Sequence, residues 1–240
     1  MPSSVRALGT ILGVWAHPDD ETYLSAGIMA EAVRNGQRVV CVTATRGEAG
    51  SQDEIRWPSS EMAAIREAEL QASLAALGVQ EHHWLDYVDG TCDSIPEEQA
   101  VAKLRTIFED VNPDTVLTFG PEGLTGHPDH QAVSAWTTVT FDRFGKAGAS
   151  LLYAIHDQEW FEEFGPDLVR NNVFAPGTPP VGARGQMAIA HELDGDLYEV
   201  KLAALRAQVS QVELLHAALG QDFLDRALGL ETFREAARHP

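Results

Sequence analysis

The sequence predicts an α/β fold in which a mainly parallel sheet is covered by helices on both faces. Strand-length runs rich in apolar and β-branched residues alternate along the chain with stretches of helical periodicity. Helices between strands provide the crossovers that parallel strands require. Residues capable of chemistry follow successive strand-like runs, among them His17, Asp89 and His127. Because ligands bind beyond the carboxyl ends of such strands, we expect the active site at that edge of the sheet.

Five strands and four connecting helices are expected in the first part of the chain. The strands are expected over 8–16, 37–45, 84–88, 115–119 and 151–156. The helices are expected over 22–35, 61–77, 97–111 and 131–144. Gly36 and Gly78 end the first two helices, since glycine accepts the left-handed conformation that follows a helix. Asn112-Pro113 stops the third, because a residue before proline is biased away from helix.

Beyond residue 156 the periodicity weakens. An insertion or lid is expected over 161–184, which holds Gly177-Thr178-Pro179-Pro180, a strand over 187–193 and an amphipathic helix over 197–209. No repeat, low-complexity tract or linker divides the 240 residues. The sequence therefore predicts one domain, with a core over about 1–155 and with 156–240 supplying the lid and capping elements.

The charge of the chain excludes several classes of partner. Seventeen Lys and Arg against 36 Asp and Glu give a formal net charge of −19. Such a chain repels phosphate backbones, and it is unsuited to an anionic membrane surface. The longest apolar stretch, over 7–16, is too short to span a bilayer. We therefore expect a cytoplasmic protein that acts on a small molecule, without nucleic acid or membrane as a partner.

Two histidine-proline-aspartate motifs carry the chemical signal. They are His17-Pro18-Asp19-Asp20-Glu21 and His127-Pro128-Asp129-His130. Each proline is expected at the first helical position, and an aspartate in a first helical turn tends to stay ionised. Histidine and carboxylate ligands suit zinc when a fourth position is left to water. His17 and Asp20, three residues apart, can chelate one ion from a tight turn, and the second motif can supply a third ligand.

The paired motifs resemble the LmbE/PIG-L-type N-acetylglucosaminyl deacetylases. The resemblance continues through Thr45-Arg46-Gly47-Glu48-Ala49-Gly50 and Ile65-Arg66-Glu67-Ala68-Glu69-Leu70, and it covers roughly the first 155 residues. It implies a Rossmann-like fold and a zinc-dependent amidase that removes an acyl group from an amino sugar. One zinc ion per chain is implied, and other divalent transition metals remain open.

The resemblance also implies a role for each motif residue. The implied zinc ligands are His17, Asp20 and His130. The implied catalytic residues are Asp19 as general base, His127 as the group that stabilises the oxyanion and protonates the leaving amine, and Asp129 as the acid that orients His127. Arg66 and Asp89 match positions that contact the substrate in some family members. Gln208 departs from the pattern, because family members often carry histidine near this position.

Together these features predict a metal-dependent hydrolase that removes an N-acyl, most simply N-acetyl, group from a small amino-sugar conjugate. The alternatives are an amidase that cleaves a thiol-sugar conjugate and a non-catalytic metal-binding module of the same fold. A two-metal phosphoesterase would need more ligands than the motifs supply. A dinucleotide oxidoreductase is disfavoured because no Gly-x-Gly-x-x-Gly follows the first strand. Assembly into a homo-oligomer is left open.

Overall fold

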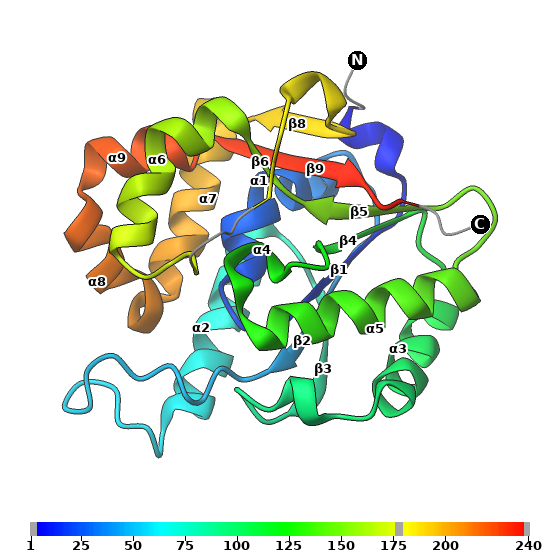
Figure 1. Ribbon diagram of the computed structural model, residues 1–240, viewed down its shortest axis with the longest axis horizontal. Coiled ribbons are helices and arrows are strands. Elements are labelled where there is room, and N and C mark those ends of the chain that lie inside the picture. Colours follow the sequence, from blue (N-terminus) through cyan, green and yellow to red (C-terminus); the bar gives the residue numbers. More distant parts are fainter. Residues whose placement is uncertain (1–3, 176–179, 238–240) are drawn as a thin grey trace.

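A seven-stranded sheet forms the centre of the molecule in a computed structural model, which describes residues 4–175 and 180–237 (Figure 1). Its order is β3-β2-β1-β4-β5-β9-β8. The strands are β1 Ile11–Trp15, β2 Val39–Thr45, β3 Glu81–Tyr87, β4 Thr115–Phe119, β5 Ser150–Ala154, β8 Ile189–Glu192 and β9 Leu230–Glu235. β6 His156–Asp157 and β7 Val181–Gly182 form a separate parallel pair. The first five strands are parallel, β9 runs antiparallel to β5, and β8 at the edge pairs antiparallel with β9.

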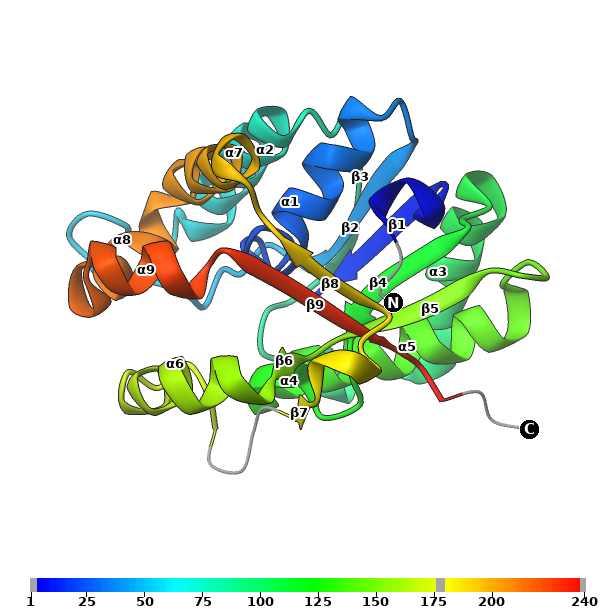
Figure 2. The ribbon, with the colours of Figure 1, turned by 90° about the horizontal axis from the view of Figure 1, so that it is seen from above.

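Helices cover both faces of this sheet (Figure 2). They are α1 Asp20–Arg34, α2 Met62–Leu77, α3 Glu97–Val111, α4 Gly123–Gly126, α5 Pro128–Phe144, α6 Gln158–Arg170, α7 Gly195–Ala207, α8 Val209–Leu219 and α9 Gln221–Ala227. Short 3₁₀ turns occupy Val5–Leu8, Cys92–Ser94 and Arg184–Gln186. On one face α7 packs against α1 and α2, and on the other α3 packs against α5. The predicted fold class is confirmed.

The buried strands follow from the composition of the chain. Every residue of β1, β2 and β4 is buried, as the continuous apolar and β-branched runs predict for a sheet covered on both faces. Gly78 ends α2 at φ 77°, and Asn112 ends α3 in the same left-handed region at φ 47°. The two predicted stops therefore lie where the sequence places them.

The amino-terminal elements differ from the prediction in small ways. β3 begins at Glu81, so that His82 and His83 lie inside the strand and not before it. Pro128 is the first residue of α5, as predicted, but Pro18 lies in the turn before α1, whose N-cap is Asp19. The prediction for Pro18 is wrong because the chain needs an extra turn between β1 and α1 to carry the first motif.

The carboxyl-terminal third differs more. The expected lid over 161–184 is largely the helix α6, followed by β7, and Pro176 to Pro179 of its proline-rich stretch lie outside the described residues. Helices α8 and α9 and strand β9 were not predicted. No helix among the described residues is both long enough and apolar enough to cross a membrane.

Candidate active site

The two motifs meet at the carboxyl edge of the sheet because β1 and β4 are neighbouring parallel strands. The first motif spans the turn after β1 and the start of α1, and the second, which follows β4 in the chain, spans the N-cap and first residues of α5. Nδ1 of His17 lies 3.2 Å from Nε2 of His130. The fold thus brings together two histidines that are far apart in the sequence.

His130 is oriented from behind by the backbone. Its Nδ1 lies 3.0 Å from the carbonyl oxygen of Gly123, which can only accept a hydrogen bond, and its ring stacks on Phe119. The proton is therefore on Nδ1, and Nε2 presents a lone pair to the site. Burial lowers the pKa of His130 to about 4, so the ring is neutral at pH 7. A neutral imidazole held in one tautomer by a backbone carbonyl is the usual form of a metal-binding histidine.

His17 lies at the centre of a cluster of carboxylates. Its Nε2 is 3.0 Å from Asp89 Oδ1 and 3.3 Å from Asp129 Oδ2, and its backbone N–H donates to Asp20 Oδ2 at 2.8 Å. Burial lowers the pKa of His17, but hydrogen bonds with Asp129 and Asp89 and the charge of Asp20 outweigh it and raise the pKa to about 10. The His17 ring thus lies among carboxylates, and a bound metal cation would neutralise their negative charge as the protonated ring does.

The three predicted zinc ligands lie within contact distance of one another. The carboxylate of Asp20 lies 3.7 Å from Nδ1 of His17 and 3.3 Å from Nε2 of His130. The site offers two imidazole rings and one carboxylate, and all three side chains are nearly buried. This set of nitrogen and oxygen donors suits zinc. His127 and His130 with His17, and Asp89 and Asp129 with His17, also form groups with metal-ligand spacing. The residues present therefore fit a metal ion.

Asp19 stands beside this cluster and is held by a cation. Its Oδ2 accepts a hydrogen bond at 3.2 Å from Nη2 of Arg66, which is itself only 4% exposed. Burial raises the pKa of Asp19 to about 7, although the positive charge of Arg66 opposes that shift. Asp19 also has φ 105°, a conformation that L-residues rarely adopt. This backbone turns the Asp19 side chain to a different side from that of Asp20.

Asp129 and His127 contact each other through the backbone. The N–H of Asp129 donates to Nδ1 of His127 at 3.1 Å, whereas the Asp129 carboxylate accepts from the N–H groups of Gly90 and Cys92 and contacts His17. Burial alone would raise the pKa of Asp129, but these bonds lower it to about 2. Burial and the charge of His17 lower the pKa of His127. Because Nδ1 accepts the Asp129 N–H, the proton of the neutral ring lies on Nε2.

The side chains of Arg66 and Asp89 are only 4% and 8% exposed. Besides Asp19, Arg66 donates to the carbonyl oxygens of Gly47 and Pro18. Asp89 accepts from the N–H of Ala49 at 3.0 Å in addition to contacting His17, and these partners lower its pKa against the effect of burial. Both side chains are therefore engaged by the protein's own groups. Their predicted role in contacting the substrate stays a prediction.

Gln208 has a role that the sequence did not reveal. It lies between α7 and α8, is buried, and donates from Nε2 to Glu21 Oε1 at 2.7 Å and to Thr22 Oγ1 at 2.9 Å. Burial raises the pKa of Glu21 to about 7, although its hydrogen bonds oppose the shift. Gln208 therefore connects the carboxyl-terminal helices to the helix that carries Asp20. The sequence feature that could have indicated this contact was Glu21, the last residue of the first motif.

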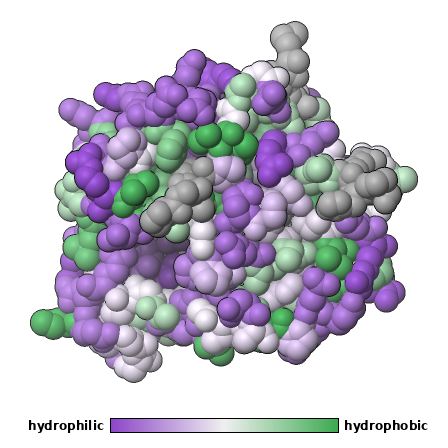
Figure 3. Space-filling model, in the orientation of Figure 1, coloured by the Kyte–Doolittle hydropathy of each residue, from purple (hydrophilic) through white to green (hydrophobic). Residues whose placement is uncertain are grey.

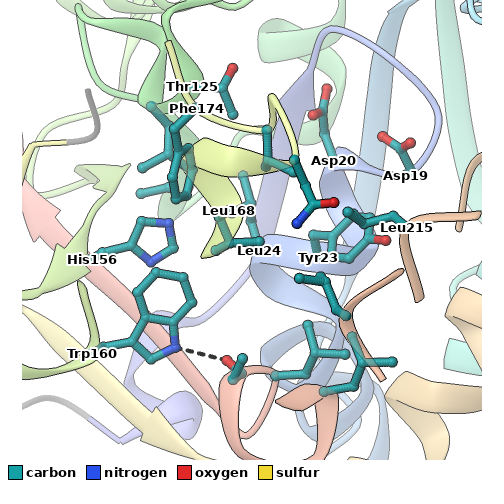
Figure 4. Close-up of a pocket in the computed structure, with 18 of the residues that line it drawn as sticks. Asp19, Asp20, Tyr23, Leu24, Thr125, His156, Trp160, Leu168, Phe174 and Leu215 are labelled. Carbon is teal, nitrogen blue, oxygen red and sulfur yellow. Dashed lines mark hydrogen bonds between the residues drawn. The ribbon is translucent and has the colours of Figure 1, made fainter. Parts of the chain in front are cut away.

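A cavity of about 570 Å³ opens directly beside Asp19, Asp20 and His130. Figure 4 shows the two aspartates at one end and Trp160 at the opposite end. The surface is hollowed between α8 and α4, with hydrophilic residues around the opening (Figure 3). Most of the far wall comes from α6, α8, α9 and β9, the elements that the sequence described least well.

Comparison with known proteins identifies the family of the chain. Residues 12–141, which include both motifs, match the family model described as PIG-L, GlcNAc-PI de-N-acetylase. The chain is 30% identical over 259 residues to the 1D-myo-inositol 2-acetamido-2-deoxy-alpha-D-glucopyranoside deacetylase of Acidothermus cellulolyticus, covering 93% of this chain and 87% of that protein. It is 27% identical over 223 residues to the protein of the same name from Corynebacterium glutamicum, covering 84% and 74%.

Solved structures share the fold. N,N'-diacetylchitobiose deacetylase from Pyrococcus horikoshii superposes with a TM-score of 0.62 at 22% identity, covering 95% of this chain and 83% of that one. The zinc-inhibited form of teicoplanin deacetylase Orf2 gives 0.65 at 17%, covering 94% and 97%. A 4-carboxy-2-hydroxymuconate hydratase from Pseudomonas putida gives 0.62 at 14%, covering 97% and 98%, so this fold also serves another reaction. The family model and the paired motifs together show that the chain belongs to the PIG-L family.

Proposed function

We propose that the chain is an amide hydrolase that removes an N-acyl group, most simply N-acetyl, from a small amino-sugar conjugate at a single metal centre. The observation that carries the proposal is the convergence of both motifs on one cluster, with Asp19 beside it and bonded to Arg66. A protein that only binds a metal needs no such basic group next to its ligands. Family membership supports a carbon–nitrogen bond outside peptides as the bond cleaved.

His17, Asp20 and His130 would hold zinc, in line with their donor atoms and mutual distances. When bound, zinc lowers the pKa of a coordinated water to about 7 and polarises a carbonyl. Asp19 accepts the proton of the attacking water at its carboxylate, and Arg66 keeps that carboxylate in place. His127 donates from Nε2 to the oxyanion and then to the departing amine, since its Nδ1 is occupied by the Asp129 N–H.

A two-metal phosphoesterase is less consistent with this geometry. The two groups with metal-ligand spacing found among the described residues both include His17, so they describe one centre and not two. A site for two ions would need ligands for each. Measurement of metal content distinguishes the readings, because we expect one ion per chain and a phosphoesterase of this kind would hold two.

The experiment that tests the proposal is a release assay on metal-loaded protein. N-acetylglucosamine conjugates, including inositol, chitin-fragment and thiol-bearing conjugates, are incubated with enzyme loaded with one equivalent of zinc, and acetate and free amine are measured. Release of both in equal amounts is expected from at least one conjugate. Cobalt and excess zinc serve as parallel loadings, since a zinc-inhibited relative is known. Absence of release from every conjugate at every loading would contradict the proposal.

A further inference from the structure

The cavity beside the site has an apolar far end. We call this part the apolar chamber, and define it by Leu168, Phe174, Leu219, Phe223 and Leu224, all of which line the cavity. They come from α6, the segment after it, α8 and α9, so they surround the space from several directions. Leu168, Phe174 and Leu224 are buried, with exposed fractions of 8%, 5% and 4%. The apolar chamber is thus a built feature of the fold and continuous with the aspartates of the site.

The chamber has a flat aromatic wall. His156 and Trp160 stack with ring centroids 3.9 Å apart and an interplanar angle of 7°. Nε1 of Trp160 donates to the carbonyl oxygen of Ala227 at 2.8 Å, as the dashed line in Figure 4 marks. The indole therefore has its only donor satisfied and offers a carbon face. Apart from the His156 ring nitrogens and the amides of Asn171 and Asn172, the described residues of these walls offer no polar side chain to replace the water that a sugar hydroxyl would lose.

The charges around the cavity disfavour an anionic substituent in the apolar chamber. Of the described residues that line it, none is lysine or arginine. The acidic ones are Asp19, Asp20 and Glu231. Glu231 is already paired with Lys201 at 2.9 Å and accepts the N–H groups of Gly27 and Ile28. A phosphate or carboxylate in the apolar chamber would find no lysine or arginine among the described cavity-lining residues to pair with, because the cation of the site, the proposed metal ion, lies at the opposite end beside Asp20.

Polar groups gather at the opposite end, where the sugar must lie. Thr125, Gln52 and Gln211 line the cavity together with Asp19 and Asp20. These side chains can bond sugar hydroxyls, and the amide to be cleaved must reach Asp19 and Asp20. The amino sugar therefore occupies the polar end, and the remainder of the substrate extends toward the apolar chamber.

We propose that the natural substrate is an amino-sugar conjugate bearing an uncharged apolar substituent, alkyl or aryl, that fills the apolar chamber. This rests on the proposed function, which places the amide at Asp19 and Asp20. The substituent is carried either by the acyl group or by the aglycone, and the chemistry that recognises it is the same in both cases.

Two substrate series test the proposal and separate these sources. In one, the N-acyl chain on methyl glucosaminide is lengthened from acetyl to octanoyl; in the other, the aglycone of N-acetylglucosamine is lengthened from methyl to octyl or replaced by phenyl. In the series whose substituent enters the chamber, kcat/KM is expected to rise about fourfold for each methylene buried, until the chamber is filled. The other series is expected to show no such rise. A matched aglycone ending in phosphate is expected to react no faster than the methyl glycoside.

Two tryptophan variants on one helix provide the matched control. Ala218 lines the cavity, whereas Ala217 beside it on α8 does not, and both are exposed, so neither substitution disturbs the core. We expect Ala218→Trp to reduce the ratio of kcat/KM for the longest substrate over the shortest at least tenfold. Ala217→Trp is expected to leave that ratio unchanged.

A binding measurement separates failure of this inference from failure of the proposed function. Alkyl glucosides without an amide are titrated into the protein by calorimetry, where affinity is expected to rise with chain length and to fall in Ala218→Trp. The inference is overturned if the enzyme is active but kcat/KM does not change with chain length in either substrate series. It is also overturned if the aglycone ending in phosphate is preferred. Tighter binding of longer glucosides by a protein that releases no amine from any conjugate supports the chamber and contradicts only the proposed function.

Discussion

Asp19 illustrates how much of the site depends on the conformation of a single residue. With φ 105° it occupies a region that costs an L-residue of order 1–3 kcal/mol, and such conformations cluster where function requires them. The benefit here is geometric, since Asp20 reaches the two histidines while Asp19 faces the cavity and Arg66. Adjacent carboxylates thereby acquire different surroundings.

The first prediction separates the roles of these residues. Asp19→Ala is expected to retain zinc and lose turnover by about 10²–10⁴-fold, the usual contribution of a general base. His130→Ala is expected to lose zinc, because it removes one of three ligands. Zinc content by atomic emission and initial rates of amine release measure both effects. Equal zinc content and equal activity in the two variants would overturn the assignment.

A second prediction concerns the close contact between Gly47 and Arg66. A Cβ atom at Gly47 would clash with Nη1 of Arg66, whereas at Gly36 it would meet nothing within 4 Å. Both glycines have positive φ, 64° and 77° respectively, so alanine costs similar backbone strain at each, about 1–2 kcal/mol. Gly47→Ala must in addition displace Arg66 from Asp19, and we expect kcat to fall at least tenfold.

Gly36→Ala is the control for this variant. Its melting temperature is expected to fall by the backbone strain alone, and so by less than that of Gly47→Ala, while its kcat stays within twofold of the unmodified enzyme. Thermal melts and steady-state kinetics on both proteins provide the comparison. If the two variants retained the same kcat, Arg66 would have no part in positioning Asp19.

At the scale of elements, α1 is joined to the last part of the chain by a buried ion pair. Lys201 on α7 donates to the carbonyl oxygen of Tyr23 at 2.7 Å and to Glu231 on β9 at 2.9 Å. Glu231 accepts the N–H groups of Gly27 and Ile28 at 2.9 and 2.8 Å. Both charged side chains are about 1% exposed or less. Three elements thus share one hydrogen-bonded group.

Removing either charge from this pair is expected to destabilise the fold strongly. Lys201→Met leaves Glu231 buried without its cation, which typically costs about 3–5 kcal/mol. Arg105→Ala, which breaks the exposed Arg105–Glu109 pair on α3, is expected to cost about 0.5 kcal/mol or less. Urea denaturation of both variants measures the difference. A loss below about 1 kcal/mol in Lys201→Met would show that the pair does not hold α1 in place.

Elements with a clear local sequence signal were predicted, and elements that depend on distant partners were not. Helix α3 and strand β4 were predicted at their observed bounds, because Asn112-Pro113 separates a clear helical period from a β-branched run. Strand β9 was missed because it holds the buried, paired Glu231, a residue type that normally indicates solvent. The start of α8 was missed because Gln208 interrupts the helices without glycine or proline. In both cases tertiary partners decide the local structure.

For the whole molecule, acid is expected to weaken the fold partly through His156. Burial, and then the charge of Lys201, lower the pKa of His156 to about 3, below its ordinary value of 6.5. The unfolded chain therefore binds a proton at His156 that the folded chain does not, in the interval between these two values. Stability from this residue is complete above about pH 6.5 and declines as pH falls, by at most about 1.4 kcal/mol for each unit.

His156→Phe tests this expectation, because phenylalanine can keep the stacking on Trp160 but cannot take up a proton. Free energies of unfolding at pH 7, 6, 5 and 4 are expected to decline less steeply in the variant than in the unmodified protein. His83→Gln, which changes an exposed histidine on β3, is the control and should leave the slope unchanged. Parallel curves for all three proteins would contradict the role given to His156.

The site was accessible to sequence reasoning to the extent that it depends on adjacent strands. His17 and His130 were brought together by the rule that carboxyl ends of parallel strands share an edge, and the structure places them in contact. The apolar chamber was not accessible, because Leu168, Phe174 and Phe223 are scattered over separate helices and each reads as ordinary core. The chemistry lies in short motifs, whereas the shape of the substrate pocket arises only from packing.

The contact of Glu231 with α1 also has a consequence for the order in which the protein is synthesised. Both motifs leave the ribosome long before residue 231, so the nascent chain already holds every predicted metal ligand. The amides of Gly27 and Ile28 and the cation of Lys201 must wait for the last strand. A chain in that interval has the ligands of the site without the contact that ties α1 to the sheet edge. Formation of β9 is therefore the step at which α1 gains its contacts with the carboxyl-terminal part of the enzyme.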